Sequence, residues 1–184
     1  DALKVNAVLT YLNLRDNLLD AEAGRALAKA LETNAVLTEC NVLENELGVQ
    51  TAKMLAKICT DKRIILSGIG HDRKEADFSG KDLKPSDGIL IASDLSVNEV
   101  LTECNVLRNA LDVESANTLA KIGTEKRIML SGIKHDQTEA TFFNESLNPA
   151  DGMLIASDLM VTAVLTSLNL SENELCGLDD DGHG

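Results

Sequence analysis

Two histidine–aspartate pairs contain the residue types in this chain that could perform chemistry. His71-Asp72 and His135-Asp136 carry the groups of a metal site or of an acid–base pair. The pairs are 64 residues apart, and the sequence around them repeats at the same interval. They therefore recur because a longer segment is duplicated, and no third type of ligand clusters with them. We expect a structural role in a loop.

Three other stretches suggest ligand chemistry more weakly. Asp179–Gly182 hints at a calcium loop, but it lacks the full ligand pattern and the closing glutamate, so an acidic tail is expected there. Gly80-Lys81 lacks the preceding glycine of a phosphate loop. Lys62-Arg63 and Lys126-Arg127 are expected to be solvated loop charges. Since no nucleophile stands out beside a base, the sequence predicts no enzyme, no catalytic residue, no metal and no cofactor.

The composition restricts the class of partner. Apolar residues make up 44% of the chain and aromatic residues 2%, so the core must be aliphatic. The net charge of −13 disfavours nucleic acid and anionic membranes, and it favours a basic protein partner. The chain shows neither a signal-peptide pattern nor an apolar run of about 18 residues. A cytoplasmic location is therefore expected.

The four cysteines do not have the spacing of a disulfide framework. Cys40 and Cys104 occupy the same position in two copies of a repeat, while Cys59 and Cys176 stand elsewhere. We expect small buried thiols in a reducing compartment.

One decamer is written four times and organises the chain. It begins at Val8, Val36, Val100 and Val164, in steps of 28, 64 and 64 residues. Each step of 64 residues contains a weaker copy, so the chain has six repeats and an internal duplication. The weaker copies are Ala76–Leu83 and Ala140–Leu147.

Each repeat predicts a strand followed by a helix. Apolar and polar residues alternate in the strand segments, which predicts one buried face. The strands are expected near 10–15, 38–43, 74–79, 102–107, 138–143 and 166–171. Helical spacing predicts helices over Ala21–Glu32, Val49–Ile58, Ser86–Leu95, Val113–Ile122 and Ala150–Leu159. This is an α/β chain with parallel strands and right-handed crossovers. Because packed helices need more room than paired strands, six neighbouring strands should form a concave face, with the helices on the convex face.

Two repeats carry eight extra residues, within Thr60–Lys74 and Thr124–Thr138. We expect long helix-to-strand loops here, with room for a short extended segment at Ile64–Leu66 and Ile128–Leu130. Residues 1–176 are predicted to form a single domain, followed by an acidic, glycine-containing tail at 177–184 that should be disordered. Neither end carries a polar capping repeat, so the chain is expected to be part of a longer array or a domain that has lost its caps, and its ends could self-associate.

The repeats resemble the leucine-rich repeat family in its long, ribonuclease-inhibitor-like form, and the alanine-rich helices resemble those of cytosolic NOD-like receptors. The pattern LxxLxLxxNxL is complete in two repeats, from Leu9 to Leu19 and from Leu165 to Leu175. The resemblance implies a curved solenoid in which buried asparagines bridge adjacent turns. Lys81 and Glu145 replace that asparagine in the weaker repeats, so the ladder should be interrupted there.

The resemblance also implies that partners bind on the concave face, at the outward strand positions. Those expected to bind are Tyr11, Asn13, Arg15, Glu39, Asn41, Glu75, Asp77, Glu103, Asn105, Arg108, Glu139, Thr141, Ser167 and Asn169. Leu43 and Leu107 are assigned to the same outward face. Several of these residues form an acidic row suited to a basic partner, although a duplicated solvated face would carry the same glutamates.

The expected function is a protein-interaction scaffold. Two alternatives stay open, namely a regulator similar to the repeat-built activators of Ran-type GTPases and a sensing segment of a larger NOD-like receptor. The first alternative would need an edge loop that contacts a nucleotide-bound partner. The second would need an adjoining NTPase or signalling domain outside this chain.

Overall fold

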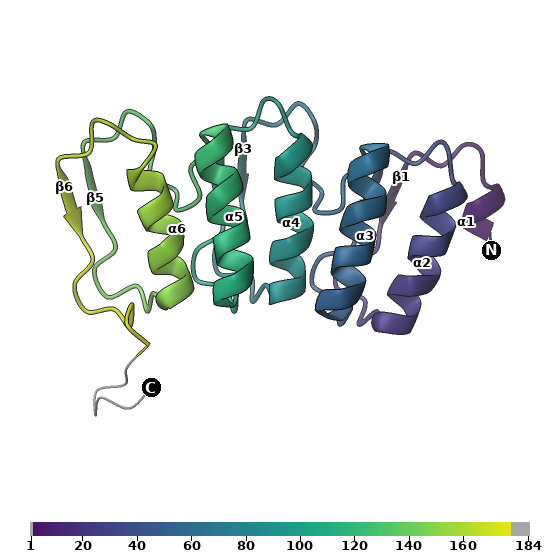
Figure 1. Cartoon of the computed structure of the whole chain (residues 1–184), viewed down its shortest axis with the longest axis horizontal. Coiled ribbons are helices and arrows are strands. Elements are labelled where there is room, and N and C mark those ends of the chain that lie inside the picture. Colours follow the sequence, from purple (N-terminus) through teal and green to yellow (C-terminus); the bar gives the residue numbers. More distant parts are fainter. Residues whose placement is uncertain (1, 178–184) are drawn as a thin grey trace. The chain divides into compact units, whose positions relative to one another are not determined.

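The chain alternates helices with short parallel strands, as the predicted α/β class requires (Figure 1). The computed structural model describes residues 2–177. Its helices are α1 (Ala2–Val5), α2 (Ala21–Thr33), α3 (Gly48–Lys62), α4 (Pro85–Val97), α5 (Val113–Lys126) and α6 (Pro149–Leu159). Its strands are β1 (Tyr11–Asn13), β2 (Glu39–Asn41), β3 (Glu75–Asp77), β4 (Glu103–Asn105), β5 (Glu139–Thr141) and β6 (Ser167–Asn169). Each strand lies within one of the six predicted segments and is three residues long.

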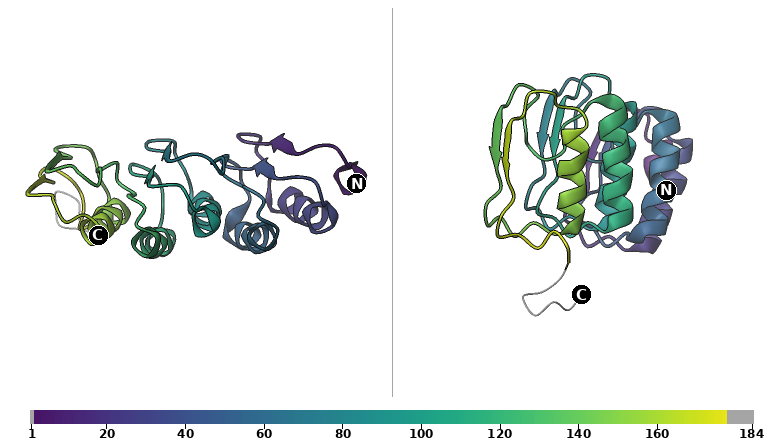
Figure 2. Two further views of the ribbon diagram at one scale, coloured as in Figure 1. Left: turned by 90° about the horizontal axis from the view of Figure 1, so that it is seen from above. Right: turned by 60° about the vertical axis from the view of Figure 1, so that its left-hand side comes forward.

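The described residues divide into two compact units, where the sequence predicts a single domain. Unit 1 contains the residues up to 73 together with 83–99, and unit 2 contains 74–82 together with the residues from 100 onward. Strand β3 therefore belongs to unit 2, although the helix that follows it, α4, belongs to unit 1. Figure 2 shows that, within each unit, the strands lie on one side and the helices on the other.

The strands form three two-stranded parallel sheets in the described residues, in place of the predicted row of six neighbouring strands. The pairs are β1–β2, β3–β4 and β5–β6. The cause is the inserted segment, which occupies the second edge of β2. The N–H of Cys40 donates to the carbonyl of Ile65 at 2.7 Å, and the N–H of Ile65 donates to the carbonyl of Thr38 at 3.0 Å. The eight extra residues therefore supply a short extended segment, and both edges of β2 are occupied.

The same arrangement recurs in unit 2. The N–H of Cys104 donates to the carbonyl of Met129 at 2.7 Å, and the N–H of Val106 donates to the carbonyl of Leu130 at 3.0 Å. Strand β4 is thus bonded on one edge to β3 and on the other to the inserted segment 128–130. Among the strands of residues 2–177, β5 pairs with β6 alone.

Two buried carboxylates accept hydrogen bonds from the ends of the inserted extended segments. Asp94 of α4 accepts hydrogen bonds from the N–H of Leu66 at 2.9 Å and from the N–H of Ser67 at 2.7 Å. The hydroxyl of Ser67 also donates to Asp94, at 2.6 Å. Asp158 of α6 makes the equivalent contacts, including a 2.5 Å bond from the hydroxyl of Ser131. Burial raises the pKa of Asp94 to about 7 and that of Asp158 to about 6, although the bonds from the serines lower both.

Side chains also fix the ends of the helices. Asp20 caps α2, because its carboxylate accepts from the N–H of Ala23 at 2.8 Å. The Nζ of Lys62 donates to the carbonyls of Leu31 at 2.8 Å and Asn34 at 2.9 Å. These contacts satisfy acceptors that the C-terminal end of α2 would otherwise leave open.

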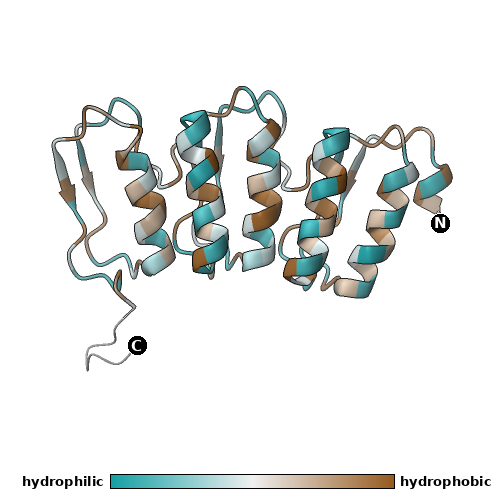
Figure 3. Cartoon of the chain, viewed as in Figure 1, coloured by the Kyte–Doolittle hydropathy of each residue, from teal (hydrophilic) through white to brown (hydrophobic). Residues whose placement is uncertain are grey.

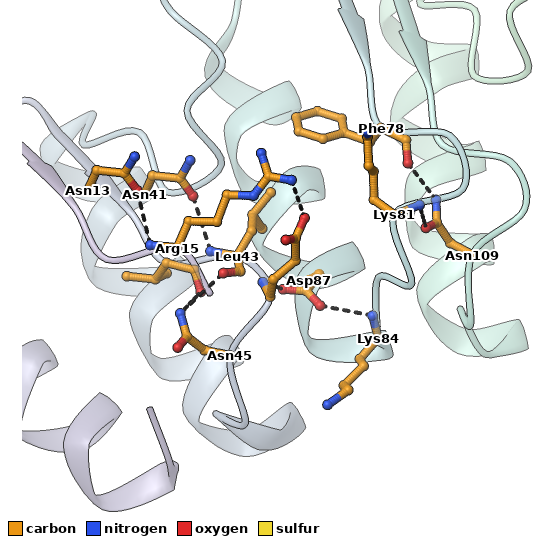
Figure 4. Close-up of polar contacts among 12 residues, drawn as sticks. Asn13, Arg15, Asn41, Leu43, Asn45, Phe78, Lys81, Lys84, Asp87 and Asn109 are labelled. Atoms are coloured by element: carbon orange, nitrogen blue, oxygen red, sulfur yellow. Dashed lines mark hydrogen bonds and ion pairs between the residues drawn. The ribbon is translucent and has the colours of Figure 1, made fainter. Parts of the chain in front are cut away.

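Asparagines of three repeats join a strand turn to the one before it, as Figure 4 shows for Asn45 and Asn109. Asn45 is 2% exposed. Its carboxamide oxygen accepts from the N–H of Asn17 at 3.0 Å, and its nitrogen donates to the carbonyl of Leu14 at 2.8 Å. Asn109 and Asn173 make the equivalent bonds in unit 2. One side chain in each of these repeats therefore satisfies donors and acceptors of two turns.

Lys81 and Glu145 still take part in the bridge from the following repeat, through their backbone N–H groups. Within unit 2, the side chain of Glu145 pairs with Arg108, and no asparagine-type bond from it to the preceding repeat is found among the described residues, in agreement with the predicted interruption there. The backbone N–H of Lys81 donates to Asn109 at 3.0 Å, and that of Glu145 donates to Asn173 at 3.1 Å (Figure 4). The bridge depends on a backbone donor, so any residue type serves on that side.

The core is aliphatic. Leu55, Leu90 and Ile91 are fully buried in unit 1, and Leu119 and Leu154 are fully buried in unit 2. Helices α4 and α6 are more apolar around their surface than the other helices (Figure 3). The rigid framework that carries the strand face is therefore built from aliphatic packing and backbone bonds.

Candidate partner-binding face

Most of the predicted binding residues reach the surface of their unit. The structure places Tyr11, Asn13, Glu75, Asp77, Arg108, Glu139, Thr141, Ser167 and Asn169 in exposed positions. Arg15, Glu39, Glu103 and Asn105 are half-buried, while Asn41 is buried. Because these side chains project from short hydrogen-bonded strands or from the turns after them, their backbone positions are fixed.

Three outward assignments differ from the structure. Asn41 is 8% exposed, and it lies so close to Gly68 of the inserted segment that a Cβ on Gly68 would be 2.7 Å from its Nδ2. Leu43 and Leu107 are 0% and 3% exposed. The strands end at Asn41 and Asn105, so the alternation of inward and outward side chains does not extend to these leucines.

The face of unit 2 carries several carboxylates. Glu75 and Glu103 are direct partners in the β3–β4 register. Lys134, from the inserted segment, lies 3.5 Å from the carboxylate of Glu103. The pKa of Asp77 is lowered, chiefly by hydrogen bonds from the backbone and the hydroxyl of Ser79. The charged form of Asp77 is thus favoured on this face.

The face of unit 1 is more mixed. Tyr11 is 52% exposed and is the register partner of Glu39. Arg15 forms an ion pair with Glu44. The N–H of Glu44 donates to Asp87 of α4 at 2.9 Å. Unit 1 therefore presents an aromatic ring beside a carboxylate, with the neighbouring cation already paired.

A pocket of about 180 Å³ opens in unit 2. Its apolar lining includes Leu107, Phe142 and Leu147, and its polar lining includes Ser131 and Thr141. An ion pair of 2.8 Å between Arg108 and Glu145 contributes to the same pocket. The sequence gives no direct signal for this pocket, because it depends on where the inserted segment ends relative to β5.

The histidine pairs lie in loops. His71 is exposed, and the Nε2 of His135 lies 3.1 Å from the carbonyl oxygen of Arg127. Across residues 2–177, no three histidine, cysteine or acidic side chains come together as a set of metal ligands. The hint of a calcium loop at Asp179–Gly182 lies outside the described residues.

The cysteines are free thiols. Cys40, Cys59 and Cys104 are buried, and Cys176 is exposed. Burial raises the pKa of Cys40 and of Cys59 to about 12, so these thiols stay protonated near neutral pH. The buried surroundings of these thiols suit a role in packing the core.

No protein-family model matches the chain, and no curated protein matches it either. Among the described residues, no helix combines the length and the apolar character needed to cross a bilayer.

Proposed function

We propose that this chain is a leucine-rich-repeat scaffold that binds a protein partner on the face formed by its strands. The observation that carries the proposal is the difference in burial between the two sets of strand positions. The inward positions of the second and fourth repeats are buried as framework, while most outward strand positions of the chain are polar and exposed. The buried framework residues are Cys40, Val42, Asn45, Cys104, Val106 and Asn109. A face held by backbone pairing and presenting variable polar side chains is suited to recognition.

The proposed architecture is a right-handed solenoid with a concave strand face. It is supported by the repeat spacing, by the parallel strand pairs, and by the asparagine bridges between successive turns. A strand–helix–strand connection between parallel neighbours is right-handed in about 98% of cases. Strands about 4.8 Å apart and helices about 8–10 Å apart favour curvature toward the strands.

The proposed partner presents a basic surface. Glu75, Asp77 and Glu139 are exposed carboxylates on the face of unit 2, and Glu39 contributes from unit 1. Complementary charge would speed association and fix orientation more than it would add affinity. Binding through this face should therefore weaken as the ionic strength rises.

Affinity capture with charge-reversed variants tests the proposal. The triple variant E39K/E75K/E103K should recover much less partner at low salt than the wild type does. A matched control, E22K/E32K/E125K, makes the same change of charge at exposed helical positions. Equal losses in both variants would indicate a nonspecific charge effect. Unchanged recovery with the strand-face variant would refute the proposed binding face.

A further inference from the structure

Strand β5 has one edge that pairs with no other strand in the described residues. Its partner β6 takes the other edge. The inserted segment 128–131 cannot extend the sheet with its N–H groups, because Asp158 accepts from the N–H of Leu130 at 2.7 Å and from that of Ser131 at 2.8 Å. The insertion thus leaves a break in the sheet between itself and β5.

The peptide groups at this break belong to alternate residues of β5. The carbonyl of Thr138 accepts from Ser167, and the N–H of Phe142 donates to Asn169, so the even-numbered residues bond toward β6. The peptide groups of Glu139 and Thr141 therefore point to the opposite edge. The carbonyl of Glu139 accepts from its neighbour Gln137 at 2.6 Å. For the backbone of Thr141, no hydrogen bond to another described residue is found.

The 180 Å³ pocket lies beside this edge. It is lined by Thr141 and Phe142 from the β5 side and by Leu107 and Ser131 from the other side, while no residue of β6 lines it. The pocket is larger than the roughly 150 Å³ that holds a benzene molecule. One side chain of that size therefore fits in it, against Leu107, Phe142 and Leu147, while the rest of the lining is polar. An open strand edge beside a side-chain pocket is the arrangement that binds an added peptide strand.

We infer that the open edge of β5 is a docking slot for an extended segment of a partner protein. The segment pairs its backbone with the N–H and carbonyl of Thr141 and places one valine, isoleucine or leucine side chain in the pocket. Lysine or arginine residues flank that side chain, because Glu139 is exposed at the slot and Glu75, Asp77 and Glu103 lie on the same face of the unit. The inference rests on the proposed function in taking the partner to be a basic protein, and it adds the mode of binding.

A library of short synthetic peptides with lysine flanks and a randomised centre is the probe. After selection on the wild-type chain, the tightest peptide is measured by fluorescence anisotropy against T141P and T141Y. Proline removes the edge N–H without removing a bond to β6, and tyrosine fills the pocket while leaving the backbone donor in place. Each variant should weaken binding about tenfold or more. The control V113P places proline at the first residue of α5, outside the strand face, and it should bind like the wild type.

Hydrogen exchange gives an independent readout on the wild type. The peptide should slow exchange of the Thr141 amide, and T141P should retain slow exchange at Phe142, which reports an intact β5–β6 pair. The slot is refuted if no peptide binds with Kd below roughly 1 mM, or if T141P and T141Y bind like the wild type. A peptide that is insensitive to Thr141 but is lost on E75K/E103K would refute the slot and still support the strand face. If E39K/E75K/E103K loses partner capture but no peptide binds the wild type, the slot is likewise refuted and the strand face is still supported.

Discussion

Replacing Asp94 with asparagine tests how much its hydrogen bonds to the inserted segment stabilise the fold. Asp94 is 4% exposed. Its side chain accepts hydrogen bonds from the N–H groups of Leu66 and Ser67 and from the Ser67 hydroxyl. At pH 5 the Asp94 side chain is the neutral acid, because its pKa is about 7. Both of its oxygens keep acceptor capacity, whereas asparagine has one acceptor oxygen and turns an NH₂ group toward the same donors. An unsatisfied buried donor costs about 1–3 kcal/mol, so D94N should lower the free energy of unfolding by about that amount at pH 5.

The pH dependence of this difference has a definite sign. Burial raises the pKa of Asp94 from an ordinary value of 3.8 to about 7 in the folded chain. Between these two values, the folded chain holds a proton that the unfolded chain has released, so the free energy of unfolding falls as the pH rises. This contribution is full below pH 3.8 and is lost as the pH rises to about 7. The advantage of the wild type over D94N should therefore shrink by up to about 1.4 kcal/mol per pH unit.

Urea unfolding followed by far-ultraviolet circular dichroism measures this difference at pH 4, 5.5, 7 and 8. The variant D61N, which changes an exposed aspartate of α3, controls for the loss of one surface charge. A wild-type advantage that grows between pH 4 and 7 would contradict the reasoning. It would mean that the three hydrogen bonds favour the carboxylate more than burial disfavours it.

Three further substitutions probe single contacts. The hydroxyl of Thr162 is buried without a partner among the described residues, at the repeat position where Asn34 accepts from two backbone N–H groups, so T162N should raise the free energy of unfolding by about 1 kcal/mol in urea titrations. K62M removes a cation from the carbonyls at the end of α2. It should lower the free energy of unfolding by about 1–3 kcal/mol and the melting temperature by several degrees. K57M, on the exposed side of α3, should change the melting temperature little. Gly132 has φ +81°, a backbone conformation that strains any residue with a side chain, and a Cβ there would lie 2.9 Å from the Nδ2 of Asn105. G132A should therefore destabilise unit 2 by about 1–3 kcal/mol, measured as faster amide exchange there.

The periodicity of the sequence predicts the positions of the strands and helices well. Columns of identical residue type, such as the asparagines at 45, 109 and 173, repeat because each repeat makes the same bonds to its neighbour. Asp20 could be assigned as a helix cap from its position alone, since capping depends on a few adjacent residues.

The pairing of the strands could not be predicted in the same way. The inserted segment takes the second edge of β2 and of β4, and this follows from its path in space. One signal was present in the sequence: Ser67 and Ser131 recur in register with Asp94 and Asp158, 27 residues later. A serine and an aspartate at a fixed spacing on two elements are compatible with a buried hydrogen bond. Whether the two side chains meet depends on the fold, so the sequence alone does not predict the contact.

The candidate face was predicted only in part. Exposed residues such as Glu75 and Glu139 follow from strand alternation, because the strand reaches that far. The buried position of Leu43 does not follow from strand alternation, because the strand ends at Asn41. The chain then turns, and Glu44 adopts a left-handed backbone with φ 59°. The pocket beside β5 joins residues from three separate segments, and no local pattern marks such a site.

Hydrogen exchange of the chain with and without a captured protein partner tests the central claim most directly. The account predicts slower exchange in the strand segments, above all at β3, β4 and β5, with the outer helical surfaces of α2, α3 and α5 unchanged. Slower exchange confined to those helices, with the strand segments unaffected, would contradict the claim that this chain binds through its strand face.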